Sequence, residues 1–472
     1  MKSSIKLLIV LFLPLCALLG CFDNIPHYQN SDYLSSDPDL VEDHLIKPKP
    51  SWDEFRYYDR VITFLNNSWN TSAYLYPIPI LGNGSLENPY FIKDCDIPFN
   101  PVKIYKEYIL FEIDIGSNHI IFENCEFSTT CEYVYGIVIK NPKPDHQIII
   151  KNCTFSNFIW RDPIYMINIQ NGTLENCFLL NSYHITLSLC SNIKVAGNSF
   201  YHTISHGLYL YRNNNTHVTN NTFRTVGYSG VALVYPSYNN IIANNYFQYC
   251  VMSIALGGYK IRDLLWGKPA SPWRYYAPVN TTIRNNIIEY TLSTGIGIPY
   301  SNSTTIIQNT ILYSGFEGIA LGECRESIIQ SNYVKGSGTH GIFLQECNYT
   351  QIQLNEVDNN AQNGVYVNDS SYTSVLSNTI TNSGLYGLRV QSSRKSIIKQ
   401  NSFSNNNIGN VRGVVGAFYM NNTSTAIAAA WMGGFYIIFG FTTLGIIRKL
   451  KKEKKHLSWK RKVHSLRNPD LL

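Results

Sequence analysis

Charged side chains are scarce in this 472-residue sequence, at 15% of the total, and there are only five methionines and seven tryptophans. Low charge combined with 44% hydrophobic residues excludes an intrinsically disordered chain. The sequence also lacks a Walker loop, a His-Glu-x-x-His pair, a Cys-x-x-Cys pair and a Gly-x-Ser-x-Gly turn. No activity can therefore be assigned from a nucleotide-binding, zinc-protease, dithiol or serine-hydrolase signature.

Positive charge is concentrated at the C-terminal end. The chain has 38 Lys and Arg against 32 Asp and Glu, and residues 448–472 alone contribute ten basic and two acidic residues. The remainder is mildly acidic, which argues against a nucleic-acid partner for the body of the protein. We expect no nucleic acid among its partners.

The N-terminal residues 1–21 have the pattern of a secretory signal. Lys2 and Lys6 precede the apolar run 7–19, which is followed by Gly20 and Cys21. Leu18-Leu19-Gly20-Cys21 also resembles a lipobox, so lipidation of Cys21 is an alternative to plain cleavage.

A second apolar run, 426–447, contains no charge and is long enough to span a bilayer as a helix. The basic tail 448–472 follows at once and is expected to stay in the cytoplasm. These features predict a single-pass cell-membrane protein with an extracellular or periplasmic ectodomain.

Between these ends the chain repeats every 23 residues or so. The pattern Asn-x-(Phe/Ile/Val) recurs with spacings of 22 to 24, apart from one of 41, and from Ile288 onward each spacing is 23. Glycines 23 residues apart open a second apolar segment, and a third precedes each Asn. The predicted Asn column comprises Asn176, Asn198, Asn221, Asn245, Asn286, Asn309, Asn332, Asn355, Asn378 and Asn401.

Three short alternating segments per repeat predict one coil of a solenoid with an apolar interior. The predicted fold is all-β, a right-handed parallel β-helix of about twelve coils, in which stacked Asn amides hydrogen-bond to one another. We expect an N-terminal cap helix over 52–66, because Ser51-Trp52-Asp53-Glu54 forms a capping box. The expected segments are a polar lead 22–50, a cap and first coil 51–120, repeats 121–403, a cap or stalk 404–425, and the C-terminal transmembrane helix.

The segment from Gly82 to Ile92, Gly-Asn-Gly-Ser-Leu-Glu-Asn-Pro-Tyr-Phe-Ile, is followed by Asn-rich coils. This arrangement resembles the right-handed β-helix repeat proteins of the NosD-like periplasmic copper-binding and carbohydrate-binding or sugar-hydrolase group. The resemblance implies the fold over roughly 76–411. It leaves function open, because lyases, hydrolases, adhesins and proteins without activity share this fold.

Three acidic residues, Glu323, Glu346 and Asp369, fall in one column on consecutive coils. Carboxylates about 4.8 Å apart repel unless a cation or a proton lies between them, so this column is a candidate for catalysis or for Ca²⁺ binding. The alternative is a solvated acidic turn. Similarly, His184, His206 and Cys190 form a candidate copper site, or else the histidines simply hydrogen-bond within turns.

The spacing of 41 marks an insertion within 257–279 that is rich in aromatic residues. Aromatic rings stack on sugars and also serve protein interfaces, whereas packing against the coil flank is the alternative. The candidate ligand-binding residues are Trp266, Trp273, Tyr275, Tyr276, and two outward strand residues, Phe343 and Tyr366. The stacked pairs Cys324/Cys347 and Cys125/Cys153 are compatible with disulfides or with free thiols.

Three functions follow as hypotheses. The first is a membrane-anchored β-helix that binds glycans or cell-surface proteins. The second is a polysaccharide lyase or glycoside hydrolase that uses the acidic column, and the third is a NosD-like copper-handling accessory protein.

Overall fold

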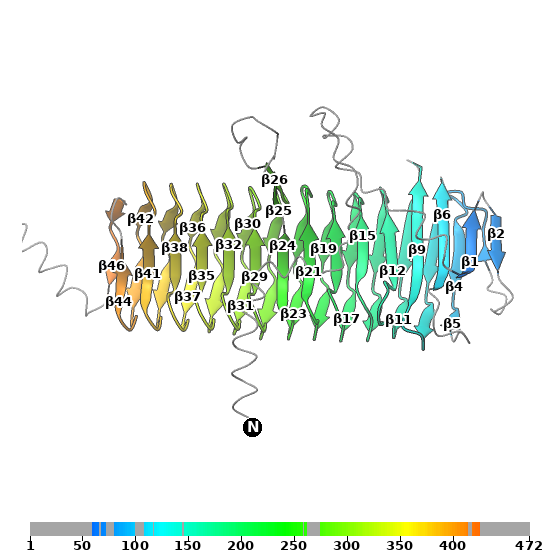
Figure 1. Ribbon diagram of the computed structural model, residues 1–472, viewed down its shortest axis with the longest axis horizontal. Helices are drawn as coiled ribbons and strands as arrows, with labels where there is room; N and C mark the ends of the chain where they lie inside the picture. The colour runs from blue at the N-terminus through cyan, green and yellow to red at the C-terminus, as the bar shows by residue number, and fades with distance from the viewer. Residues whose placement is uncertain are drawn as a thin grey trace, which may run out of the picture. The chain divides into compact units, whose positions relative to one another are not determined.

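The computed structural model describes residues 59–65, 68–71, 80–99, 108–116, 118–143, 146–257, 259–261, 274–413 and 418–424. These residues belong to one compact unit, Tyr58–Leu472. They form three long sheets in which each strand pairs with its counterparts in the preceding and following coils (Figure 1). The predicted parallel β-helix of about twelve coils is therefore confirmed.

Sheet A carries the surface discussed below, and its strands are parallel except for the first pair. In spatial order they are β2 (Ser68–Thr71), β1 (Asp59–Leu65), β6 (Tyr108–Gly116), β9 (Val134–Pro142), β12 (Ile164–Ile167), β15 (Ile185–Ser188), β18 (Leu208–Tyr211), β21 (Ser229–Val234), β24 (Met252–Gly257), β29 (Ile296–Pro299), β32 (Ile319–Gly322), β35 (Ile342–Gln345), β38 (Val365–Asn368), β41 (Tyr386–Gln391) and β44 (Gly409–Arg412).

Sheets B and C supply the other two sides of each coil. Sheet B contains β3 (Ile80–Leu81), β4 (Tyr90–Lys93), β7 (His119–Glu123), β10 (Gln147–Lys151), β13 (Gly172–Glu175), β16 (Ile193–Ala196), β19 (His217–Thr219), β22 (Ile241–Ala243), β27 (Thr282–Arg284), β30 (Thr305–Ile307), β33 (Ile328–Gln330), β36 (Gln351–Gln353), β39 (Ser374–Leu376), β42 (Ile397–Lys399) and β45 (Phe418–Met420). Sheet C contains β5 (Asp96–Phe99), β8 (Glu126–Thr129), β11 (Thr154–Ser156), β14 (Phe178–Leu180), β17 (Ser199–Tyr201), β20 (Thr222–Arg224), β23 (Tyr246–Gln248), β28 (Ile287–Glu289), β31 (Thr310–Leu312), β34 (Tyr333–Lys335), β37 (Glu356–Asp358), β40 (Thr379–Thr381), β43 (Ser402–Ser404) and β46 (Thr423–Ser424).

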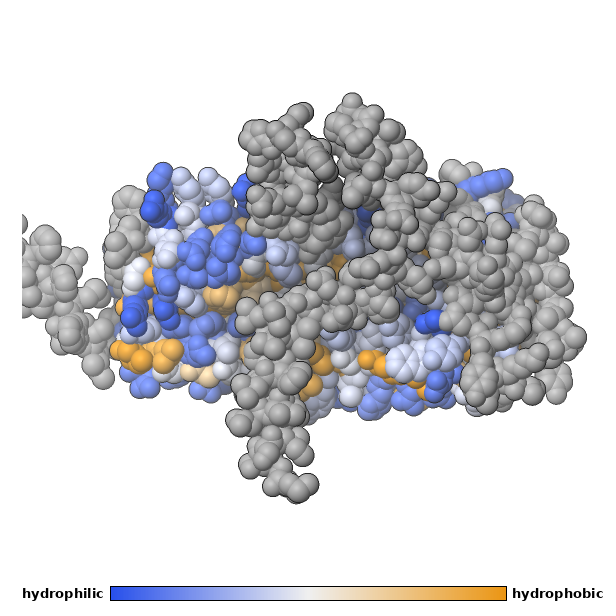
Figure 2. Space-filling model, in the orientation of Figure 1, coloured by the Kyte–Doolittle hydropathy of each residue, from blue (hydrophilic) through white to orange (hydrophobic). Residues whose placement is uncertain are grey.

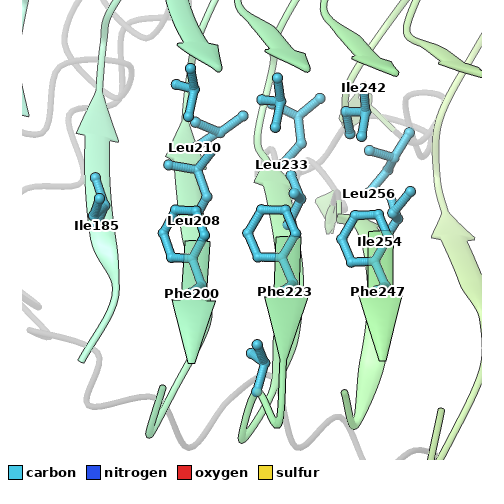
Figure 3. Packing of buried hydrophobic residues seen from close by; sticks show 14 of the residues in the cluster. Ile185, Phe200, Leu208, Leu210, Phe223, Leu233, Ile242, Phe247, Ile254 and Leu256 are labelled. Atoms are coloured by element: carbon cyan, nitrogen blue, oxygen red, sulfur yellow. The ribbon is translucent and has the colours of Figure 1, made fainter. Parts of the chain in front are cut away.

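The interior is a stack of like side chains on like side chains. The rings of Phe200, Phe223 and Phe247 lie 4.6 and 4.8 Å apart along sheet C, nearly parallel to one another (Figure 3). Inward residues of the neighbouring sheets, such as Leu208 and Ile242, fill the rest of the coil and are buried. Burial of a Leu or Phe side chain contributes about 1.5–3 kcal/mol, so every coil adds to stability through its own three strands.

The asparagine ladder lies at the turn between sheets B and C. The amide of Asn309 accepts from the backbone and side chain of Asn286 at 3.0 and 2.9 Å, and it donates to Asn332 at 3.0 Å. The same pattern runs from Asn198 to Asn401 and continues to Asn422. The ladder is confirmed except at Asn176, because Cys177 occupies that rung and donates its backbone N–H to Asn198.

The expected helix over 52–66 is wrong for residues Asp59–Leu65. Residues 51–58 lie outside the described part of the chain, and Asp59–Leu65 forms strand β1, paired with β6. Val61, Ile62, Thr63 and Phe64 are β-branched or aromatic, and pairing with β6 outweighs the helical spacing of the apolar residues.

The predicted signal, lead, membrane segment and cytoplasmic tail lie outside the described residues. Over the described ranges, no helix has both the length and the hydrophobicity that crossing a membrane requires. The C-terminal segment 404–425, expected to be a cap or stalk, contains β44, β45 and β46, which continue the three sheets.

Candidate functional site

The outward face of sheet A carries a cluster of aromatic and polar side chains on β35, β38 and β41. We call His340, Phe343, Tyr366 and Arg389 the His340 site. The Phe343 and Tyr366 rings stack with centroids 5.3 Å apart, and the Arg389 guanidinium lies 4.8 Å from the centre of the Tyr366 ring. The register places Phe343, Tyr366 and Arg389 side by side on consecutive coils, so the two predicted aromatic ligand-binding residues do lie together.

Hydrogen bonds hold three members of the His340 site, namely His340, Tyr366 and Arg389. The His340 ring lies 5.5 Å from Phe343 and 5.1 Å from Tyr366, and its Nδ1 accepts the backbone N–H of Asn363 at 3.2 Å. The Tyr366 hydroxyl and the Arg389 guanidinium both donate to Gln391, at 2.9 and 2.8 Å. Burial lowers the pKa of His340, and Arg389 adds to this effect while Glu317 opposes it.

The predicted acidic column borders this site. Glu323, Glu346 and Asp369 each follow a sheet A strand at a left-handed turn position, with φ of 49°, 55° and 46°. Glu346 and Asp369 are exposed and Glu323 is half-buried. Gln345 Nε2 donates to Glu346 Oε1 at 3.3 Å, which connects the column to the strand that carries Phe343.

The predicted copper ligands do not converge. The His184 and His206 rings lie 5.7 Å apart, just before strands β15 and β18 of sheet A, whereas the Cys190 thiol is buried and donates to the backbone carbonyls of Met166 and Ser188. Nowhere in the described ranges do three or more His, Cys, Asp or Glu side chains form a group suited to a metal ion.

A buried carboxyl accompanies these histidines. Asp162 Oδ1 lies 3.5 Å from His184 Nε2, with its side chain 10% exposed. Burial raises the pKa of Asp162 to about 7, against the opposing effects of Thr186 and Arg161, and burial lowers the pKa of His206 to about 4. At neutral pH both histidines are therefore uncharged, since the pKa of His184 is also held well below its ordinary value by burial and by His206.

The aromatic insertion leaves sheet A directly after β24. Its described parts are two antiparallel strands, β25 (Tyr259–Ile261) and β26 (Arg274–Tyr276), which contain Tyr275 and Tyr276 (Figure 1). Trp266 and Trp273 lie outside the described residues. The hairpin starts from the same end of the sheet A strands as the acidic column does.

Two functional candidates were not found in the sequence, His340 and Asp162. His340 stands directly before a glycine of the repeat, in the same position as His206. This shared position is the sequence signal that marks His340 as a candidate. Asp162 precedes Pro163 in a coil without that glycine, so no repeat signal marks it.

Where the C-terminal coils are visible in the space-filling view, hydrophobic and hydrophilic residues are intermixed (Figure 2).

Comparison with known proteins agrees with the coil architecture. A family described as periplasmic copper-binding protein (NosD) matches residues 271–440, and one described as right handed beta helix region matches residues 92–259. With these two matches and its stacked parallel coils, the chain is a β-helix repeat protein. No curated protein matches the sequence.

Several solved structures are similar at low identity. The periplasmic alginate epimerase AlgG is 14% identical over 72% of this chain and 86% of its own, with a TM-score of 0.42. The A-module of the Azotobacter vinelandii mannuronan C-5 epimerase AlgE4 is 12% identical over 65% of this chain and 87% of its own, with a TM-score of 0.42. Tailspike protein 3 of bacteriophage CBA120 is 11% identical over 70% of this chain and 56% of its own, with a TM-score of 0.45.

Proposed function

We propose that this β-helix binds a polysaccharide at the His340 site. The observation that carries the proposal is the stacked pair Phe343–Tyr366, held between Arg389 and His340 on an outward face. Half-buried aromatic rings beside fixed amide and imidazole groups suit a sugar, which has apolar C–H faces and hydroxyl groups at its edges. The sheet behind them is rigid, so little ordering is needed on binding.

The location we propose is outside the cell membrane, in the extracellular space or the periplasm. The family that matches 271–440 is described as periplasmic, which supports this location. The predicted leader 1–21 and membrane segment 426–447 would then hold the β-helix at the cell surface, where a polysaccharide or a cell-surface protein can reach it.

A glycan array probed with full-length protein in detergent tests the proposal. Phe343→Ala and Tyr366→Ala should each weaken binding about tenfold, because each removes one ring of the stack. Tyr238→Ala is the matched control, since Tyr238 is an exposed tyrosine outside the site. Unchanged binding in both site variants, or equal loss in the control, would refute this role for the His340 site.

A processing activity is the second candidate, favoured by the acidic column beside the site. Glu346 and Asp369 follow paired strands on neighbouring coils, which are about 4.8 Å apart. Retaining glycosidases use two carboxyls roughly 5–5.5 Å apart, so side chains on adjacent coils are candidates for such a pair. With Glu323 they are proposed as general acid and base, whereas the described residues offer no group of three such side chains suited to Ca²⁺. Glu346→Gln should abolish depolymerisation of any polysaccharide that the protein cleaves, and no cleavage across a broad panel would remove this candidate.

The insertion and the copper hypothesis complete the proposals. Deleting residues 262–273, which include Trp266 and Trp273, tests whether the loop adds to glycan binding beside Tyr275 and Tyr276.

Copper handling draws support from the name of the matching family alone. It requires stoichiometric copper after dialysis of the full-length protein, and His184→Ala with His206→Ala should abolish that copper if these histidines are ligands.

A further inference from the structure

The last two coils of the β-helix differ in charge from the rest of the chain. Residues 22–369 contain 21 Lys and Arg against 30 Asp and Glu. Residues 370–425 contain five Lys and Arg and no Asp, Glu or His. The chain is therefore acidic over most of its length and basic where the β-helix ends.

The five basic residues lie on sheets A and B and on the turn between them. Arg389 of β41 belongs to the His340 site, and the register places Arg412 of β44 beside it. Arg394 and Lys395 follow β41 on the turn that leads to sheet B, and Lys399 ends β42. We call Arg394, Lys395, Lys399 and Arg412 the basic belt. Since none of them lies on sheet C, the belt occupies one corner of the last two coils.

The basic belt is open to solvent and contacts neutral groups. Three of its members are exposed, and Lys399 is half-buried. Lys395 Nζ donates to the Tyr372 hydroxyl at 3.0 Å, and the Arg412 guanidinium donates to the Tyr386 hydroxyl at 3.1 Å. The ion pairs of the described residues are made by other side chains. Exposed cations of one sign without acidic partners attract an anionic surface.

The path of the chain places this corner next to the proposed membrane segment. Strand β46 ends at Ser424, and that segment begins at residue 426. The one residue between them spans at most about 3.5 Å. With 426–447 in the bilayer, the last coil lies at the headgroups, and the coil of β41 and β42 lies about 4.8 Å further along the stack. Both coils then feel the charge of the membrane surface, which reaches about 8 Å at physiological salt.

We infer that the basic belt binds the anionic lipid headgroups of the membrane that anchors the chain. Its guanidinium and ammonium groups donate to lipid phosphate oxygens, and the corner between sheets A and B rests on the headgroup layer. Sheet C of the same coils, β43 and β46, has no Lys or Arg, so the β-helix leans toward this corner. The inference rests on the proposed membrane segment and is independent of glycan binding.

Lysine labelling in lipid nanodiscs tests the inference. Full-length protein is placed in nanodiscs of phosphatidylcholine, alone or with about one third phosphatidylglycerol, and treated with a neutral amine-acetylating reagent. Mass spectrometry should show Lys395 labelled about fivefold more slowly in the anionic nanodiscs, and about 0.5 M NaCl should remove the difference by screening. Lys93 is the matched control, because it is also exposed and also packs on an aromatic ring. It lies on β4, twelve coil steps before β42, or about 60 Å away.

A pair of arginine variants separates binding from proximity to the membrane. Lys399 is the reporter, and phosphatidylglycerol should also slow its labelling about fivefold in the natural protein. In the double variant Arg394→Gln, Arg412→Gln this protection should fall below about twofold, because two of the four cations are lost. The control variant Arg224→Gln, Arg284→Gln removes the same charge from exposed positions on distant coils and should keep the protection of Lys399.

Each other outcome overturns the inference. Equal labelling of Lys395 in neutral and anionic nanodiscs shows that the belt does not bind headgroups. Protection of Lys399 that survives in the Arg394, Arg412 variant shows that the anchor alone brings the coil to the surface. If polygalacturonate or heparin protects Lys395 and phosphatidylglycerol does not, the belt binds an acidic polysaccharide instead. Protein that does not enter nanodiscs overturns the membrane segment and the inference together, whereas glycan binding at the His340 site is decided by the array.

Discussion

Each coil from Asn198 onward places an asparagine where the chain turns from sheet B to sheet C, and its amide forms hydrogen bonds in three directions. Asn309, for example, accepts from Asn286, donates to Asn332, and donates to the carbonyl of Ile283 at 3.0 Å. Asparagine suits this place because its short side chain carries a donor and an acceptor together. The thiols of Cys125, Cys153 and Cys177 occupy the same column in earlier coils with weaker hydrogen bonds.

Replacing one rung of the ladder should be costly. Asn309→Ala leaves the backbone N–H of Asn286 without its acceptor in a buried site, so we expect a loss of about 3 kcal/mol in the free energy of unfolding. Urea unfolding measures it. Asn285→Gly is the control, because Asn285 is exposed with φ of 54°, which glycine adopts freely. Equal losses in both variants would show that the ladder does not stabilise the coil.

The carboxyl of Asp162 predicts a pH dependence of stability. Its pKa is 3.8 in the unfolded chain and about 7 in the folded protein because of burial. The folded state therefore binds more protons between these values, and stability falls as pH rises from about 4 to 7. Asp162→Asn removes this loss. The free energy of unfolding of the variant, relative to that of the natural protein, should therefore rise between pH 4 and pH 8, by at most about 4 kcal/mol.

Asp358 predicts a pH dependence of stability that is opposite in direction to that of Asp162. Although partial burial acts to raise its pKa, hydrogen bonds from Asn382, Thr381 and Lys335 hold it below the ordinary value. Asp358→Asn should lose stability at neutral pH and lose little in acid. A pH profile of unfolding that is the same for both variants would contradict the assignment for Asp162.

At the scale of the strand, glycine marks the entry to sheet A because the coil leaves no room for a side chain. A Cβ on Gly341 would lie 2.4 Å from Val357 Cγ1 and 2.7 Å from the carbonyl oxygen of Gly364. The neighbours belong to the next coil, so the contact cannot be relieved without separating strands. Gly322, at the end of β32, has no atom within 4 Å of the corresponding position.

These two glycines make a matched pair of variants. Gly341→Ala should lower the free energy of unfolding by about 1–3 kcal/mol through overpacking. Gly322→Ala should change it by less than about 0.5 kcal/mol or raise it slightly, since alanine restricts the unfolded chain. Thermal unfolding of the two variants under the same conditions measures this difference. A Gly341 variant as stable as the Gly322 variant would contradict coil packing as the reason for the glycine column.

Periodicity predicted the sheets well because every coil faces the same neighbours. The Asn and Gly columns and the outward position of Phe343 and Tyr366 all follow from one period of 23. The pattern failed at the N-terminal end, where Asp59–Leu65 is a strand and Cys177 replaces the expected Asn176. There the conformation depends on pairing with a strand from a distant part of the chain. The local spacing of apolar residues gives no information on that pairing.

The candidate site was predictable only in part. The position of the aromatic residues on an outward row followed from the repeat, but the partners that hold them did not. Asp162 approaches His184 across coils of unequal length, and the thiol of Cys190 turns inward, because the turn between sheets A and B is buried. Spacing along the sequence places a residue on a coil but does not give the direction of a turn side chain.

At the scale of the whole molecule, each coil contacts only its neighbours, so opening should begin at the ends. Nine described cysteines carry free thiols, of which Cys95 and Cys131 are half-buried and Cys324 and Cys347 are fully buried. Pulsed alkylation under native conditions should label Cys95 first and Cys125 later. Cys324 and Cys347 should be labelled last, because coils on both sides must open. Equal rates at all buried thiols would indicate a single cooperative unit.

The uniform period from Ile288 to Phe403 has a consequence for the history of the gene. Because successive coils present the same interface to one another, an in-frame duplication or loss of 69 base pairs adds or removes a coil without creating a new contact surface. Such an event between β29 and β35 would change the distance between His206 and His340 by one coil spacing, about 4.8 Å, at a time. Relatives can therefore differ in the number of coils there while every remaining coil keeps the packing of its neighbours.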